Sequence, residues 1–124
     1  MSRISASAAA VTGMLAAQRR LEVSAGNVAN VSTPGFVPSR VISSEQREGG
    51  VQTRVERGMS EDAGRASGSA DSATDAALDE LAVSGTDLGT EFVSQITSQR
   101  AFEANLAVIR TEAEMLGSLV RRNG

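Results

Sequence analysis

The chain has 124 residues, a formal net charge of −3, no cysteine and no histidine. It therefore has no disulfide or thiolate metal site, and it lacks both the commonest general base and the commonest metal ligand. We predict no catalytic residue, no cofactor and no metal. The arginines are scattered and three Phe are the only aromatic residues, which argues against a nucleic-acid partner. No run of about 18 apolar residues occurs, so we predict no membrane span.

A first amphipathic helix is predicted over residues 4–30. Its apolar residues recur at steps of three and four, which is the period of one helix face. Ser2 or Ser5 is placed to cap its start. A cleaved signal peptide is disfavoured because the stretch is interrupted by Ser, Thr and Gly and keeps the helical period. Four residues of the stripe are expected to pack on other helices: Val11, Met14, Leu21 and Val28.

A turn motif is predicted at the end of this helix. Asn tolerates left-handed backbone, and a Pro-Gly pair supplies the second and third positions of a type II turn. The turn should direct the chain away from the helix end. The motif comprises Asn27, Asn30, Thr33, Pro34, Gly35 and Phe36.

Residues 37–57 are predicted to be extended. Val51, Thr53 and Val55 alternate with polar residues, the two-residue period of a half-buried strand. Gly49-Gly50 would turn this strand back against residues 41–44 as a small hairpin.

The following residues, 58–77, are rich in Gly, Ser, Ala and Asp. They cannot bury enough apolar surface to offset the entropy of ordering, so we predict a flexible loop. Asp71, Asp75 and Asp79 recur every four residues, as in a cation site on a helix. A solvated stretch is the favoured interpretation because like charges at this spacing disfavour a helix.

A second, longer helix is predicted over residues 87–122, with a length of about 50 Å. Thr86 or Asp87 should cap its start. One stripe runs along it in alternating steps of four and three, typical of a seam between helices. Gln95 and Gln99 stand in the seam, where they either set the register with a partner or simply face solvent. The predicted packing residues are Leu88, Phe92, Gln95, Gln99, Phe102, Leu106, Ile109, Leu116 and Val120.

The fold class that follows is mainly α, with the two terminal helices paired as a coiled-coil-like hairpin around a small extended, partly disordered middle. We divide the chain into residues 1–36, 37–84 and 85–124. Much of the apolar content is alanine, which buries little area, so a single copy should have a thin core. A long helix on a thin core predicts assembly with partners.

Two stretches resemble bacterial flagellar axial proteins. Asn27-Val28-Ala29-Asn30-Val31-Ser32-Thr33-Pro34-Gly35-Phe36 is similar to the N-terminal signature of the rod, hook and hook-associated proteins. Asp87-Leu88 through Gln99-Arg100-Ala101-Phe102-Glu103-Ala104-Asn105, continuing to Glu114-Met115-Leu116, is similar to their C-terminal signature. The short middle resembles the proximal-rod type within the basal-body rod protein family, and the intact C-terminal signature favours the FlgC kind. Gly26 and Val37 depart from the usual pattern.

The resemblance implies a structural subunit of the flagellar basal-body rod, without enzymatic activity. It implies that the terminal helices pack with neighbouring subunits into a helical tube that crosses the periplasm. The expected partners are the chain itself, other rod and axial proteins, and the flagellar type III export apparatus, which exports such subunits without a cleaved signal peptide. The alternative is a soluble helical adaptor or export-associated factor that binds axial subunits without entering the rod.

Overall fold

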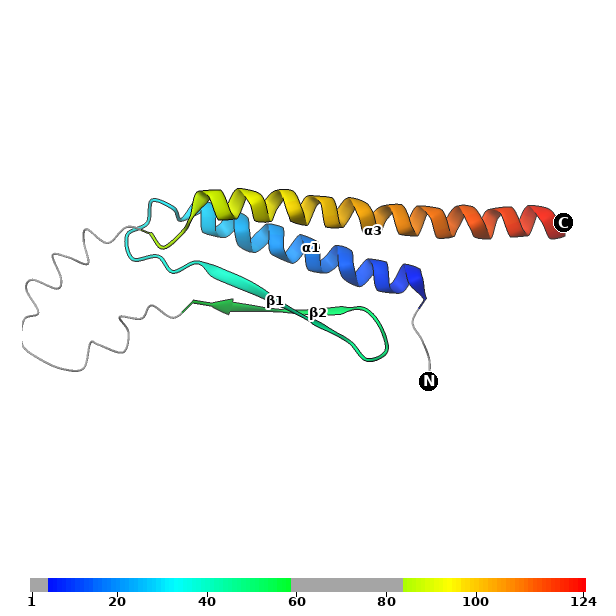
Figure 1. Ribbon diagram of the computed structural model, residues 1–124, viewed down its shortest axis with the longest axis horizontal. Helices are drawn as coiled ribbons and strands as arrows, with labels where there is room; N and C mark the ends of the chain where they lie inside the picture. Colours follow the sequence, from blue (N-terminus) through cyan, green and yellow to red (C-terminus); the bar gives the residue numbers. More distant parts are fainter. Residues whose placement is uncertain (1–4, 59–83) are drawn as a thin grey trace, which may run out of the picture.

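The computed structural model describes residues 5–58 and 84–124. The elements along these residues are α1 (Ala6–Ala29), β1 (Ser39–Glu45), β2 (Val51–Arg57) and α3 (Leu88–Asn123). Figure 1 shows α1 lying between α3 on one side and the hairpin of β1 and β2 on the other, and α1 contacts all three elements. The predicted fold class is confirmed: the molecule is mainly helical, with a helix towards each end and a small two-stranded sheet between them.

Two predictions fall on residues that the structure does not describe. The flexible loop expected over residues 58–77 lies outside the described part except for Gly58, and so do the three aspartates weighed as a cation site.

Helix α1 begins two residues later than the sequence pattern indicated. Of the two predicted caps, Ser5 is the one used, and its Oγ accepts a hydrogen bond of 3.2 Å from the Ala8 N–H. Asn30 stands at the C-cap. The predicted type II turn follows: Gly35 has a φ of +70°, and the Phe36 N–H donates to the Thr33 carbonyl at 3.2 Å. A positive φ at the third position of a turn is the reason for glycine there.

The predicted hairpin is also present. β1 and β2 pair antiparallel, with Val41 opposite Val55 and Ser43 opposite Thr53. The connecting turn has Gly49 and Gly50 at φ of 103° and 92°, which glycine adopts without steric cost.

Helix α3 has 36 residues, about 50 Å of helix. Of the two predicted caps, Asp87 is used: its Oδ1 accepts from the Gly89 and Thr90 N–H groups at 3.0 and 3.4 Å. Arg121 and Arg122 lie in the last turn. There, positive charge is stabilised by the negative end of the helix dipole.

The described core consists of small residues. Its buried apolar side chains are three alanines, and the buried polar ones are Ser24, Asn27 and Ser98. A Cβ at Gly13 of α1 would lie 2.8 Å from the Asn105 amide of α3, so the helices approach closely at this point. The thin core expected from the composition is therefore found. The buried apolar residues are Ala10, Ala16 and Ala17.

The ends of the undescribed stretch between β2 and α3 are held at one place. The Gly58 N–H donates to the Pro38 carbonyl at 3.3 Å, and the Gly85 N–H donates to the Phe36 carbonyl at 2.9 Å. Two carbonyls only two residues apart thus anchor the chain where it leaves the hairpin and where it approaches α3.

Candidate assembly surface

Asn27, the first residue of the predicted turn motif, lies in the last turn of α1 within a buried polar cluster. Its side chain is 3% exposed. Its Nδ2 donates to the Ser39 carbonyl and to Glu91 Oε1, and its Oδ1 accepts from the Ser39 N–H, each at 2.9 Å. One amide thereby joins the end of α1, the start of β1 and the first turn of α3.

Two hydroxyl groups complete this cluster. Ser24 Oγ donates to the Glu91 carbonyl at 3.1 Å, and Thr86 Oγ1 donates to the Asn27 carbonyl at 3.2 Å. We refer to Ser24, Asn27, Ser39, Thr86 and Glu91 as the Asn27 junction. It holds α1, α3 and the hairpin together by hydrogen bonds in place of a large apolar core.

The far end of the hairpin is attached to α1 separately. Thr12 Oγ1 accepts from the Val51 N–H at 3.0 Å and donates to the Ala9 carbonyl at 2.7 Å. Between these two attachments, Arg20 Nη2 donates to Ser43 Oγ at 2.6 Å. The hairpin is therefore fixed to α1 at both of its ends.

An apolar surface remains open on the α1–α3 pair. It includes a groove of about 410 Å³, none of whose lining residues belongs to the hairpin. Phe92 and Ile96 are 52% and 59% exposed there, values that leave most of each side chain without a packing partner. We call this surface the open face; its groove is lined by Leu21, Ala25, Phe92, Gln95, Ile96 and Gln99.

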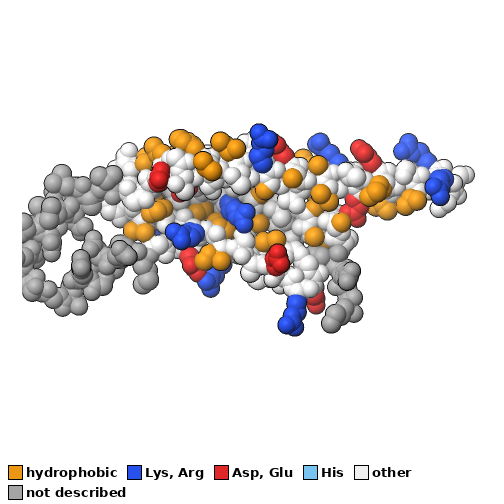
Figure 2. All heavy atoms as spheres, in the orientation of Figure 1, with side chains coloured by type: hydrophobic (Ala, Val, Ile, Leu, Met, Phe, Trp, Pro, Cys, Tyr) orange, Lys and Arg blue, Asp and Glu red, His pale blue; other side chains and the backbone are white. Residues whose placement is uncertain are grey.

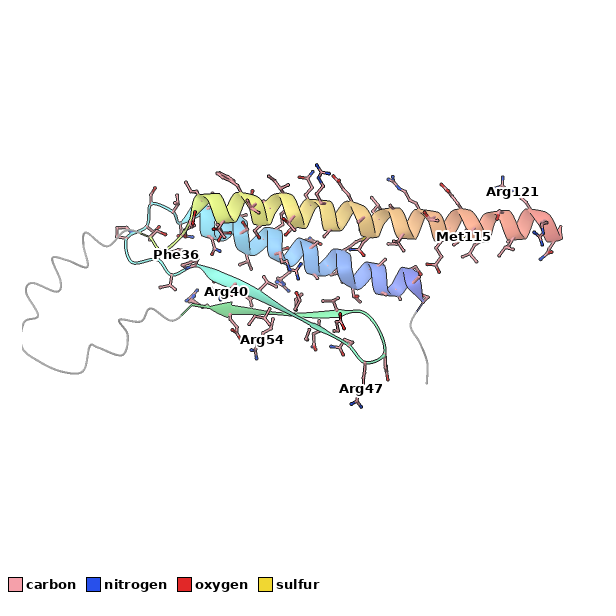
Figure 3. The ribbon with its side chains drawn as sticks, in the orientation of Figure 1. Phe36, Arg40, Arg47, Arg54, Met115 and Arg121 are labelled. Carbon is pink, nitrogen blue, oxygen red and sulfur yellow. The ribbon has the colours of Figure 1, made fainter. Side chains whose placement is uncertain are left out.

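The C-terminal part of α3 has no covering element among the described residues. Figure 1 shows α3 continuing past the start of α1, and every residue of 113–124 is exposed. Figure 3 shows Met115 projecting from this extension, which we call the tail. Leu116 and Val120 on the tail are 57% and 73% exposed, and Figure 2 shows hydrophobic side chains along α3 as far as the tail.

All of the predicted packing residues are exposed or only partly buried. The exposed ones are Val11, Leu21, Leu88, Phe92, Gln99, Phe102, Leu116 and Val120, and the partly buried ones are Met14, Val28, Gln95, Leu106 and Ile109.

Two contacts between α1 and α3 involve residues that the sequence interpretation did not single out: Gly13 of α1 approaches the Asn105 amide of α3, and Ser24 Oγ donates to the Glu91 carbonyl. On α1 the buried residues Ala10, Ala17 and Ser24 recur every seven residues, and Glu91, Ser98 and Asn105 have the same spacing on α3. The signal was a seven-residue repeat of small and polar residues beside the apolar one. Such residues let two backbones approach closely and leave larger side chains free to face outward.

Residues 5–58 and 84–124 contain no group of three or more carboxylate, His or Cys side chains able to hold a metal ion. Within the same ranges, no helix is both long and apolar enough to cross a bilayer.

Comparison with known proteins gives two matches to family models. The model described as Flagella basal body rod protein matches residues 8–36, and the model described as Flagellar basal body rod FlgEFG protein C-terminal matches residues 80–122. Together they cover more than half of the chain, including most of α1, the turn motif and nearly all of α3. No curated protein sequence matches the chain.

Proposed function

Because the chain belongs to the flagellar basal body rod protein family, we propose that it is a subunit of the rod that assembles through its two terminal helices. The family is a structural component of the flagellar basal body, not a family of enzymes. The observation that supports the proposal is the set of large apolar side chains on the open face and the tail, such as Phe92, Ile96 and Leu116, which residues 5–58 and 84–124 leave more than half exposed. Clustered exposed apolar side chains mark interaction sites.

The predicted packing residues are then the contacts to neighbouring subunits. Covering Phe92 and Leu116 with a helix of a neighbouring subunit would bury their exposed apolar area, which stabilises the assembly by about 25 cal/mol per Å² buried. The small-residue contact and the Asn27 junction fix how α1 lies against α3. The turn motif therefore contributes to assembly indirectly, by positioning the two helices that form the open face.

We further propose the short proximal-rod type, similar to FlgC. Residues 30–87, which separate α1 from α3, leave no room for the large central domain of hook and distal-rod proteins. The expected location is the part of the rod that crosses the periplasm. The expected route is the flagellar type III export apparatus, without a cleaved signal peptide.

Substitution on the open face tests this proposal. In a strain whose only copy carries Phe92→Gln, the protein should be made but missing from isolated basal bodies, and motility should be lost. Ile42→Gln is the matched control, because Ile42 is a similarly exposed apolar residue (40%) on the hairpin. Wild-type amounts of the Phe92→Gln chain in basal bodies would reject the open face as the contact. Absence of the wild-type chain from basal bodies would favour the adaptor.

A further inference from the structure

The tail of α3 begins at the level where α1 begins. The two helices run in opposite directions, and Gly13 of α1 lies against the Asn105 side chain of α3. Seven residues further towards this end of the molecule are Ala6, the first residue of α1, and Glu112 of α3. Because both helices rise by the same distance per residue, α3 has no described helix beside it from Ala113 onward.

The side chains on the α1-facing stripe of α3 change at this level. In steps of seven residues the stripe runs from Ser98 through Asn105 and Glu112 to Leu119. Ser98 is buried, and Asn105 lies against Gly13, whereas Leu119 is 52% exposed. Small or polar residues therefore stand where α1 covers the stripe, and a large apolar residue stands where α1 has ended. A leucine in this place favours a second helix that packs on the tail.

The tail is apolar over a wide arc. Its large apolar residues are each more than half exposed: Met115, Leu116, Leu119 and Val120. At about 100° per residue they span about 140° of the helix circumference, and Glu114 and Arg121 lie on the opposite side. A helix of this kind fits a groove between two other helices, where both edges of its apolar arc are covered and its charged side stays in solvent.

The groove of the open face has this form. It lies between two helices, with Leu21 and Ala25 of α1 on one wall and Phe92 and Ile96 of α3 on the other. The tail cannot reach the groove of its own chain, because Ile96 and Val120 are about 36 Å apart along one helix. A tail that occupies this groove therefore comes from another copy.

We propose that the tail of one copy seats in the groove of the next copy, with the two α3 helices parallel. Each copy then offers its groove to one neighbour and its tail to another, so the contact joins unlike surfaces. A contact of this kind does not close on itself, and its repetition generates a helical filament in which all copies point the same way. The inference rests on the proposed function and concerns the assembled rod, so it requires no folded free subunit.

Two cysteines in each copy test the contact, because the chain contains none. In a strain whose only copy is Ile96→Cys/Val120→Cys, a short bismaleimide applied to isolated basal bodies should join each copy to the next. The expected products are dimers, trimers and longer cross-linked chains, since every copy carries both halves of the contact. A two-fold pair would give dimers alone.

Ile96→Cys/Ser118→Cys is the matched control. Ser118 is also an exposed residue of the tail, and it lies two residues from Val120, on nearly the opposite side of the helix. We expect about tenfold less cross-linked product from this variant. Equal cross-linking of the two double variants would contradict the proposed seating of the tail.

Incorporation gives a second readout that does not depend on the cysteine variants. Leu119→Asp places a charge within the apolar arc, where the contact would bury it without a partner, and Ser118→Asp places the same charge outside the arc. We expect about tenfold less Leu119→Asp chain in isolated basal bodies and an amount of Ser118→Asp within about twofold of the wild type. Equal incorporation of the two variants overturns the inference.

Failure of this inference and failure of the rod function are distinguishable. Basal bodies that contain the Ile96→Cys/Val120→Cys chain but yield only single chains, or dimers alone, overturn the head-to-tail contact and leave the rod function intact. Absence of the wild-type chain from basal bodies rejects the rod function itself.

Discussion

Asn27 makes the densest set of hydrogen bonds in the described part of the molecule. Both side-chain heteroatoms are used, and the residue is 3% exposed. Asn30, three residues later, bonds only within its own helix end and turn. The two asparagines of one motif thus have different roles: Asn27 joins three elements, and Asn30 terminates α1.

Replacing Asn27 should therefore be costly. Asn27→Ala leaves the Ser39 N–H and the Glu91 carboxylate without their partner, and we expect the free energy of unfolding to fall by about 2–4 kcal/mol. Urea denaturation followed by circular dichroism measures this change. Asn30→Ala is the control and should cost about 1 kcal/mol or less. Equal losses in the two variants would contradict the special role of Asn27.

Gly13 gives a second prediction at this scale. A side chain there meets the Asn105 amide, which itself donates to the Ala101 carbonyl at 2.8 Å. Gly13→Val should separate the helices and lower the free energy of unfolding by about 1–3 kcal/mol. Gly26→Ala in the same helix meets nothing within 4 Å and should be neutral or stabilising, by up to about 1 kcal/mol. Thermal unfolding of both variants compares them, and a Gly13→Val chain as stable as the parent would argue against close approach.

At the scale of elements, the hairpin depends on α1 for its stability. Two strands alone are marginal in water, and this pair is held by the Asn27 junction at one end and by Thr12 at the other. The hairpin should therefore loosen from its turn end when the Thr12 bond is lost, while α1 and α3 keep their helical structure.

Thr12→Val isolates that bond. The substitution keeps the shape of the side chain but removes the acceptor for the Val51 N–H. We expect faster hydrogen exchange at the start of β2 and unchanged exchange in α3, because local opening is set by local bonds. Thr97→Val is the control, since the Thr97 hydroxyl donates only to the Val93 carbonyl within α3. Unchanged exchange in β2 would show that the bond does not anchor the hairpin.

At the scale of the whole molecule, the surface proposed for assembly differs from the contacts that join the helices. Small and polar residues such as Gly13 and Ser24 lie where α1 meets α3, while large apolar residues such as Phe92 and Leu116 are more than half exposed. A chain ending at residue 112 tests this division: it should keep the helix pair, with unchanged stability in urea, and should fail to associate in sedimentation. Loss of the helix pair in the shortened chain would show that the tail contributes to folding.

The sequence predicted the elements well because their signals are local. Ser5, Asp87 and the Thr33-Pro34-Gly35 turn each act within a few residues, and the alternation in residues 51–55 specifies one strand. The partners of Asn27 could not be predicted, because Ser39 and Glu91 meet it only after three elements have packed. The contact face of α3 was missed for a related reason: the apolar stripe gave the stronger signal, and small residues such as Ser98 signal close packing only when compared with the facing helix.

The two backbone bonds at Gly58 and Gly85 have a consequence for how such chains diversify. They close the helix–hairpin frame where the chain leaves β2 and where it approaches α3. Each doubling of a connecting segment costs only about 0.6 kcal/mol in loop entropy. Insertions and deletions between these glycines are thus nearly neutral for the frame, and one scaffold can give rise, by change at this single point, to descendants with middles of very different size.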